Sequence, residues 1–385
     1  MKFAFLHLLV LGVFLGLGAE SAHAYPNAIS MDYPSCINCH YHPAGNGTLT
    51  DYGRTIGVNS YSAKPFWAPK ASEEQIEKYG EFLFPGFNEL QKYIRPQFNY
   101  RGLEFWNHFN APKPAPPQWI NMETDASVVI RADEDNHLFI AGSLGRVPTG
   151  MGSYDWISRG YYAGWRPSDA LGFYAGLMDI TYGIKIPDHI AFSREATGLA
   201  ENDQADSFLV HYLSDNFEVF AQGFIGNLSQ SADLRQKGGS FVFEGGPNPG
   251  VRYGLDLLYS TNDYRKRVLT GLHTRYKVIE GSAILAEAGM AKYIPYSGAQ
   301  STGFYALLQP SFRLTRGFYW LMTAEAFSQD WLAGTPRILR FSPGFQWFLI
   351  PKVEFRTDLE LTRTLGVPTG DSDPLDLLMQ VSVWL

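Results

Sequence analysis

Apolar and polar residues alternate along many short runs of this chain, and this pattern limits the folds that the chain can adopt. The clearest run covers residues 120–132, where apolar residues fill one set of alternate positions and polar residues fill most of the other. Successive side chains of a β-strand point to opposite faces, so each such run predicts a strand with one apolar and one polar side. Similar runs cover 268–278, 353–361 and 375–385. The chain is therefore predicted to be all-β.

The spacing of the runs indicates how the strands connect. We expect about 16 strands within residues 96–385, among them 137–146, 157–165 and 171–182. Short turns such as 133–136 and 315–317 alternate with longer loops, although 261–266 is short where a long loop is expected. Alternating turn lengths are typical of a transmembrane antiparallel β-barrel of the bacterial outer membrane. A soluble β-sandwich or propeller is the alternative, but no propeller repeat of roughly 40 to 50 residues is evident.

Composition agrees with a barrel and argues against other classes. Aromatic residues make up 15% of the chain, and there are 38 glycines. After Ala24 no segment has an apolar run close to the length of about 18 residues that a membrane-spanning helix needs. The formal net charge of -7 argues against a nucleic-acid partner, which favours basic surfaces.

The amino terminus reads as a secretory signal peptide. Met1-Lys2 precedes an apolar run over 3–17, and the small residues of Ala22-His23-Ala24 follow it. Cleavage is expected after Ala24, which would make Tyr25 the first residue of the exported chain. We therefore divide the chain into a signal peptide (1–24), a c-type haem-binding segment (25–60), a linker with a short helix (61–95) and the barrel (96–385).

The two cysteines of the 385-residue chain stand in the sequence Cys36-Ile37-Asn38-Cys39-His40. This is the spacing that attaches c-type haem, because positions i, i+3 and i+4 share one face of a helical turn. Cys36 and Cys39 would form thioether bonds to one haem c, and His40 would be the proximal iron ligand. A thioredoxin-like dithiol would need alternating strands and helices, and a zinc site would need more Cys or His ligands nearby.

The second axial ligand of the iron cannot be identified from spacing. His273, on the polar side of its strand, and Met31 are the candidates. His42 is only two residues from His40 and so is badly placed to reach the opposite face of the iron. The weaker candidates are His108, His137, His189 and His211.

The segment around the motif is small for a self-sufficient cytochrome. Alone it would leave much of the porphyrin exposed, so we expect the haem to lie against or inside the mouth of the barrel. Residues 73–84 have the pattern of a short amphipathic helix, and 64–69 read as an extended linker.

An aromatic-Gly-Arg triplet, Tyr52-Gly53-Arg54, follows the haem motif after about a dozen residues. With these two motifs the chain resembles the monohaem cytochrome-porin fusions of bacterial outer membranes. The resemblance implies a 16-stranded barrel and electron transfer across the outer membrane. The implied partners are a periplasmic cytochrome or other redox protein, an extracellular metal ion such as iron or another redox partner, and the outer-membrane lipid.

The loop over 183–206 bears on which function the barrel serves. It is the third long loop, the position at which many 16-stranded porins fold a constriction into the lumen, and it carries charges of both signs. A solvated external loop is the alternative. Three functions stay open: an electron conduit, a transport porin whose haem is structural or regulatory, and a haem enzyme. The last lacks a paired acid and base near the motif.

Overall fold

A computed structural model describes residues 26–80, 92–111, 113–150, 153–188, 190–199, 203–366 and 373–384. The expected signal peptide, His189 and part of the 73–84 helix lie outside these ranges. The strands are β1 (Ile94–Trp106), β2 (Gln118–Arg131), β3 (Leu138–Gly150), β4 (Ser153–Ile157), β5 (Tyr161–Ser168), β6 (Leu171–Met178), β7 (Ala205–Leu213), β8 (Phe217–Phe224), β9 (Lys237–Asn248), β10 (Val251–Thr261), β11 (Arg265–Ile279), β12 (Ser282–Pro295), β13 (Ser301–Thr315), β14 (Phe318–Ser328), β15 (Arg337–Ile350), β16 (Val353–Leu365) and β17 (Leu375–Trp384).

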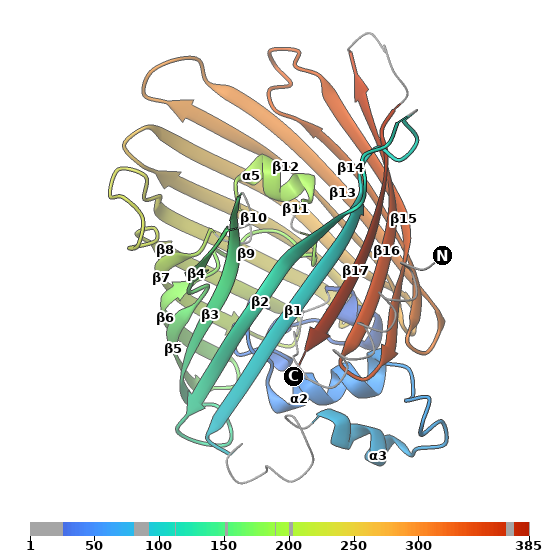
Figure 1. Ribbon diagram of the computed structural model, residues 1–385. Helices are drawn as coiled ribbons and strands as arrows, with labels where there is room; N and C mark the ends of the chain where they lie inside the picture. Colours follow the sequence, from blue (N-terminus) through green and yellow to red (C-terminus); the bar gives the residue numbers. More distant parts are fainter. Residues whose placement is uncertain are drawn as a thin grey trace.

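One antiparallel sheet holds all seventeen described strands and closes on itself (Figure 1). β1 pairs with β2 on one side and with β17 on the other, where Asn99 lies opposite Trp384. Closure joins the first and last strands of the sheet, which is the condition that a sheet must meet to stand in lipid. The predicted all-β barrel is confirmed.

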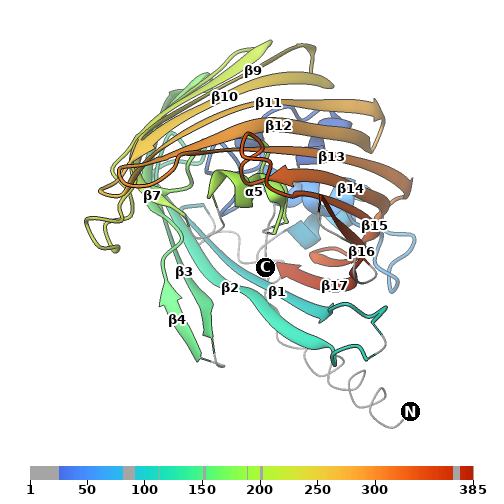
Figure 2. The same ribbon diagram turned by 90° about the horizontal axis from the view of Figure 1, so that it is seen from above.

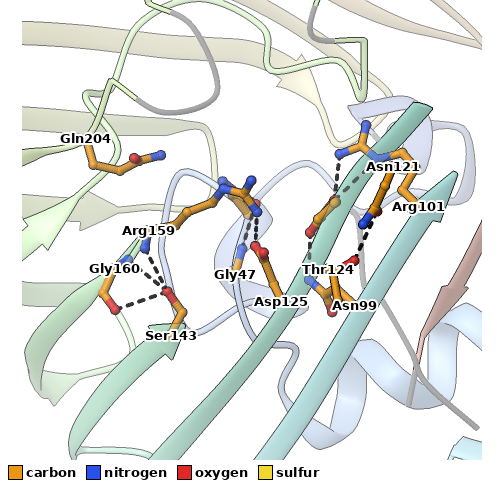
Figure 3. Close-up of polar contacts among 12 residues, drawn as sticks. Gly47, Asn99, Arg101, Asn121, Thr124, Asp125, Ser143, Arg159, Gly160 and Gln204 are labelled. Atoms are coloured by element: carbon orange, nitrogen blue, oxygen red, sulfur yellow. Dashed lines mark hydrogen bonds and ion pairs between the residues drawn. The ribbon is translucent and has the colours of Figure 1, made fainter. Parts of the chain in front are cut away.

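Sixteen of the described strands form the ring, because β4 pairs with β3 alone. The predicted strand 157–165 is wrong in its limits: the structure has β4, a break, and then β5. Ser143 on β3 explains the break. Its hydroxyl accepts from the backbone N–H groups of Arg159 and Gly160, at 3.1 and 2.9 Å, while its own N–H donates to the Gly160 carbonyl at 2.8 Å (Figure 3).

Alternate residues of each strand face lipid and lumen. On β11, Leu272 is 64% exposed whereas the adjacent His273 is 7% exposed. The lumen wall is polar and internally paired. On β1 and β2, for example, Arg101 and Asn99 both bond to Glu123, at 2.7 and 3.0 Å (Figure 3). An apolar exterior around a polar interior is the arrangement expected of an outer-membrane barrel.

Aromatic pairs mark one end of the exterior. They lie beside the short turns that join β5 to β6, β7 to β8, and β13 to β14. Ring centroids stand 5.4 to 5.8 Å apart in the pairs Trp165–Phe173, Tyr212–Phe217, Phe312–Trp320 and Phe318–Phe345. Such a girdle forms at a membrane–water interface, and short turns identify this interface as the periplasmic one.

The N-terminal segment, residues 26–80, begins inside the periplasmic end of the barrel, and its later part, with α3, lies beyond the ends of the strands (Figure 1). Its helical elements are short: 3-10 turns at Pro26–Met31, Cys36–Asn38 and Lys78–Gly80, α2 (Asp51–Ile56), a π turn at Gly57–Tyr61, and α3 (Glu73–Glu77). Asp51 bonds Arg95 of β1 at 2.5 and 2.6 Å, and Ala63 donates to the Phe348 carbonyl of β15 at 2.9 Å. The segment is therefore held by two strands that lie on either side of the β16–β17 pair.

The loop between β6 and β7 folds into the lumen. Its short helix α5 (Phe192–Thr197) stands inside the ring of strands (Figure 2). The backbone N–H groups of Gly183 and Phe192 donate to wall carboxylates of Asp256 and Glu325, at 3.1 and 2.7 Å. The inward position that the sequence left open is therefore confirmed for the described part of this loop, which we call the inner loop.

No helix within the described residues has the length and apolar character needed to cross a membrane.

A charge on the lipid face tests the assigned orientation. Replacing Leu272 by Arg should lower the free energy of unfolding by about 2–4 kcal/mol, because a guanidinium near the bilayer midplane loses its hydration. Urea unfolding in lipid vesicles, followed by heat-modifiable gel migration, measures the change. Leu272→Met is the control and should stay close to wild type. Equal behaviour of the two variants would mean that this face does not contact lipid.

Candidate functional site

The segment from Cys36 to His40 forms one closed helical turn. The N–H groups of Cys39 and His40 both donate to the carbonyl oxygen of Cys36, at 3.1 and 3.0 Å. The predicted turn geometry is confirmed, because a bond from residue i+4 to residue i places Cys36 and His40 on one face. The chain then reverses, and His40 pairs with Leu49 across a short antiparallel bridge.

Helix α2 packs directly on this turn. Thr50 caps the helix by accepting from Gly53 N–H at 3.1 Å, and its hydroxyl donates to the Asn38 carbonyl at 3.0 Å. A Cβ atom on residue 53 would lie 2.2 Å from the carbonyl oxygen of Cys39, so glycine alone fits here. Arg54 then donates to the Pro96 carbonyl at the start of β1, at 2.7 Å. These contacts give Gly53 and Arg54 of the triplet structural roles.

The imidazole of His40 is buried and fixed through one of its ring nitrogens. It is 1% exposed, and its Nδ1 lies 3.1 Å from the carbonyl oxygen of Asn46. A carbonyl acceptor requires the hydrogen on Nδ1, which leaves Nε2 as the nitrogen with a lone pair. Metal-binding histidines are commonly oriented by such a bond to their other nitrogen.

An apolar cavity opens beside the turn, and Cys36, Cys39 and His40 all line it. The rest of the lining combines residues of the N-terminal segment with residues of the barrel wall, among them Leu49, Ile56, Tyr61, Phe348 and Trp384. The two thiols, the imidazole and an apolar wall are the donor set that a covalently attached haem c needs.

The state of the thiols disfavours the other readings of the motif. Cys36 and Cys39 are not joined in a disulfide, and burial raises their pKa values to about 11 and about 12. Both thiols are therefore protonated at neutral pH, whereas reactive dithiols have lowered pKa values. Within the described ranges, no group of three metal-ligating side chains includes either cysteine, so a zinc site finds no support.

His273 is one of the two candidates for the second iron ligand, and both of its ring nitrogens are hydrogen-bonded to carboxylates. Nδ1 lies 2.7 Å from Asp256 and Nε2 lies 2.9 Å from Glu244, so in this arrangement neither nitrogen is available to iron. His273 lines the lumen rather than the apolar cavity. Met31, the other candidate, packs against the cluster of Ile56, Tyr61, Tyr319, Phe348 and Trp384, most of which borders the cavity.

The other histidines lie apart from the apolar cavity or outside the described residues. His42 packs edge-on against Tyr162, and burial lowers its pKa to about 3, so it is neutral at pH 7. His211 bonds Glu218 at 2.7 Å inside the lumen. His137 lies exposed in a short periplasmic turn, and His108 follows the opposite end of β1. His189 lies outside the described residues.

A second, larger space adjoins the first. It lies between the N-terminal segment and the inner loop, with charged groups of both signs in its lining. Cys36 and Arg275 line both spaces. The apolar cavity therefore meets the lumen at the Cys36 side of the turn.

Sequence reasoning missed Arg275 and its partner Glu244. Each lies on the polar side of a predicted strand, which marks both as lumen residues. Their meeting depends on how β9, β10 and β11 pair, and the alternation pattern contains no information about that register.

Comparison with known proteins tests the fold. No protein-family model matches the sequence, and no curated protein matches it. Among solved structures, the loop L8 deletion mutant of OmpT from Vibrio cholerae has a TM-score of 0.60 at 10% identity, covering 76% of this chain and 99% of its own. The anion-selective porin from Comamonas acidovorans has a TM-score of 0.58 at 11% identity, with coverage of 76% and 98%.

This chain has a porin-like β-barrel fold. OprB of Pseudomonas putida gives the same result, with a TM-score of 0.59 at 10% identity over 85% of this chain and all of that one. At such identities the likeness shows the fold, and the lipid-facing exterior agrees with it.

Gly53 offers a direct test of the turn. Gly53→Ala should destabilise the N-terminal segment by about 1–3 kcal/mol, because the added methyl group overlaps the Cys39 carbonyl. Gly57→Ala is the matched control, since a Cβ there meets no atom within 4 Å. Limited trypsin digestion of the purified protein should cut the segment faster in the first variant only. Equal cleavage in both variants would contradict this packing.

The raised thiol pKa values predict slow alkylation. In protein refolded without haem, Cys36 should react with iodoacetamide at pH 8 roughly 200-fold more slowly than an exposed cysteine with an ordinary pKa, and Cys39 should react more slowly still. The rate should climb with pH up to about 11, because only the thiolate reacts. Mass spectrometry of timed samples measures it. A rate that levels off near pH 7 would instead indicate a reactive dithiol.

Proposed function

We propose that this protein is an outer-membrane monohaem c-type cytochrome fused to a porin-like barrel. It would exchange electrons between a periplasmic redox protein and an extracellular donor or acceptor. The observation that carries the proposal is that Cys36, Cys39 and His40 line one apolar cavity, and that this cavity meets the lumen.

Each residue of the motif has a role in this proposal. Cys36 and Cys39 would hold the haem through thioether bonds, and His40 would bind the iron through Nε2 while Asn46 fixes the ring. The apolar wall would exclude water and so influence the reduction potential of the iron. When bound, the haem supplies one-electron exchange.

The position of the site limits what its two partners can be. The apolar band of such a barrel is about 25 Å tall, and the motif lies at its periplasmic end, so one haem does not span the membrane. On the periplasmic side, Tyr33 of the cavity contacts Tyr52, which is 49% exposed, with 3.0 Å between the hydroxyls. From outside, a partner must enter the lumen past the inner loop. A metal ion or another small solute fits this route, and a folded protein does not.

Transport is the second candidate function. The inner loop inside a polar lumen is the specific observation that favours it. The solved structures similar in fold include one protein described as an anion-selective porin and one described as an outer membrane channel. In that case the haem would be structural or regulatory.

Reconstitution separates the two functions. The haem-loaded protein in liposomes should pass electrons from a trapped reductant to an external oxidant, followed through the haem absorption bands. The Cys36→Ser, Cys39→Ser double variant should lose covalent haem and nearly all of this transfer. Wild-type protein that carries no covalent haem after denaturation would contradict the proposal. Solute flux that is unchanged in the double variant, with no electron transfer in either protein, would favour the transport porin.

A further inference from the structure

Arg275 is the fixed charge of the apolar cavity. Of the described residues that line this cavity, it alone carries a charge at every physiological pH. The side chain points inward from β11 and is 7% exposed. A buried guanidinium is costly unless it is paired, so its partners explain why it is tolerated.

Two groups hold the guanidinium in place. Glu244 of β9 accepts from both Nε, at 3.0 Å, and Nη2, which is the two-point geometry typical of arginine and carboxylate. Nη2 also donates to the carbonyl oxygen of Pro34. Pro34 is two residues before Cys36, so Arg275 also anchors the entry to the helical turn.

The partners of Arg275 continue as a chain toward the inner loop. Glu244 also bonds Nε2 of His273 at 2.9 Å, and Nδ1 of His273 bonds Asp256 at 2.7 Å. The other oxygen of Asp256 accepts from Gly183 N–H of the inner loop at 3.1 Å. An unbroken series of hydrogen bonds thus joins the apolar cavity to the constriction of the lumen.

We propose that Arg275 sets the reduction potential of the haem, and that Glu244, His273 and Asp256 fix its position and connect it to the inner loop. This inference rests on the proposed function. It also gives His273 a role other than iron ligation: it acts as a positioning residue through Glu244.

Electrostatics gives the direction of the effect. Reduction adds an electron to the haem, so a nearby positive charge stabilises the ferrous form and raises the potential. The interaction is strong because little water enters an apolar cavity to screen it. Glu244 is negative and acts in the opposite sense. Other charged residues line the adjoining lumen space, namely Glu218, Glu287 and Lys185. Their electrostatic effect on the haem is the same in wild type and in the variants of Arg275 and Glu244 described below.

The test compares two neighbouring charges of opposite sign. In haem-loaded, full-length protein, Arg275→Gln should change the ferric-to-ferrous ratio at a fixed ambient potential by about tenfold in favour of ferric, which is a 59 mV fall for a one-electron couple. Glu244→Gln should move the ratio the other way. Arg275→Lys, which keeps the charge, should restore most of the wild-type value. Spectroelectrochemical titration of the haem bands measures all three variants.

Arg252→Gln is the matched control. Arg252 also points into the lumen, from β10, and is 3% exposed, but it lines neither cavity and instead bonds the Asn216 carbonyl. Its loss should leave the potential close to wild type. Heat-modifiable migration confirms that each variant forms a barrel. If Arg275→Gln does not form a barrel, the reduction potentials of Arg275→Lys and Glu244→Gln test the inference instead.

The outcomes separate the two proposals. Opposite shifts for Arg275→Gln and Glu244→Gln, with no shift for Arg252→Gln, would establish Arg275 as the residue that sets the potential. Shifts of the same sign in both variants, or no shift in haem-loaded protein, would overturn this inference and leave the proposed function standing. Wild-type protein without covalent haem would overturn both.

Discussion

Backbone hydrogen bonding in lipid is the constraint on which the rest of this structure depends. Every strand in the hydrocarbon layer must pair on both sides, and the pairing of β17 with β1 meets that condition. Closure creates a lumen whose walls are already paired and rigid. It also forces the polar residues of each strand inward, where Arg101 and Glu123 satisfy one another. A polar, enclosed wall can hold further segments of chain through hydrogen bonds alone.

The N-terminal segment uses that wall in place of a core of its own. Its helical turns are short, and the cluster around Tyr61 is completed by Phe348 and Trp384, which belong to β15 and β17. Burying apolar side chains contributes roughly 25 cal/mol per Å². Much of this gain is open to the segment only inside the barrel. The apolar cavity is therefore shaped by the N-terminal segment and the barrel wall together, because neither of them encloses the space alone.

The alternation of residue types predicted much of this fold, and its failures have physical causes. The faces of β2, β11 and β16 follow the sequence pattern, since lipid and lumen demand different side chains at successive positions. The break between β4 and β5 was missed because it depends on one hydroxyl, that of Ser143, on a different strand. The cysteine spacing gave the helical turn because that geometry is local. The pairing of Arg275 with Glu244 is not local. The two carboxylates that bond His273 also lie on other strands, so its sequence position alone left it a candidate iron ligand.

The two segments inside the lumen also contact one another, which bears on what passes through it. Asn46 of the N-terminal segment donates to Asp179 at the start of the inner loop, at 2.7 Å, and Lys185 of that loop bonds the same carboxylate at 3.0 Å. Asn46 also supplies the carbonyl that orients His40. The inner loop thus reaches the candidate iron ligand by one path and Arg275 by another. A solute that displaced the loop would disturb both, so in this barrel the route of entry and the chemistry of the site are physically coupled.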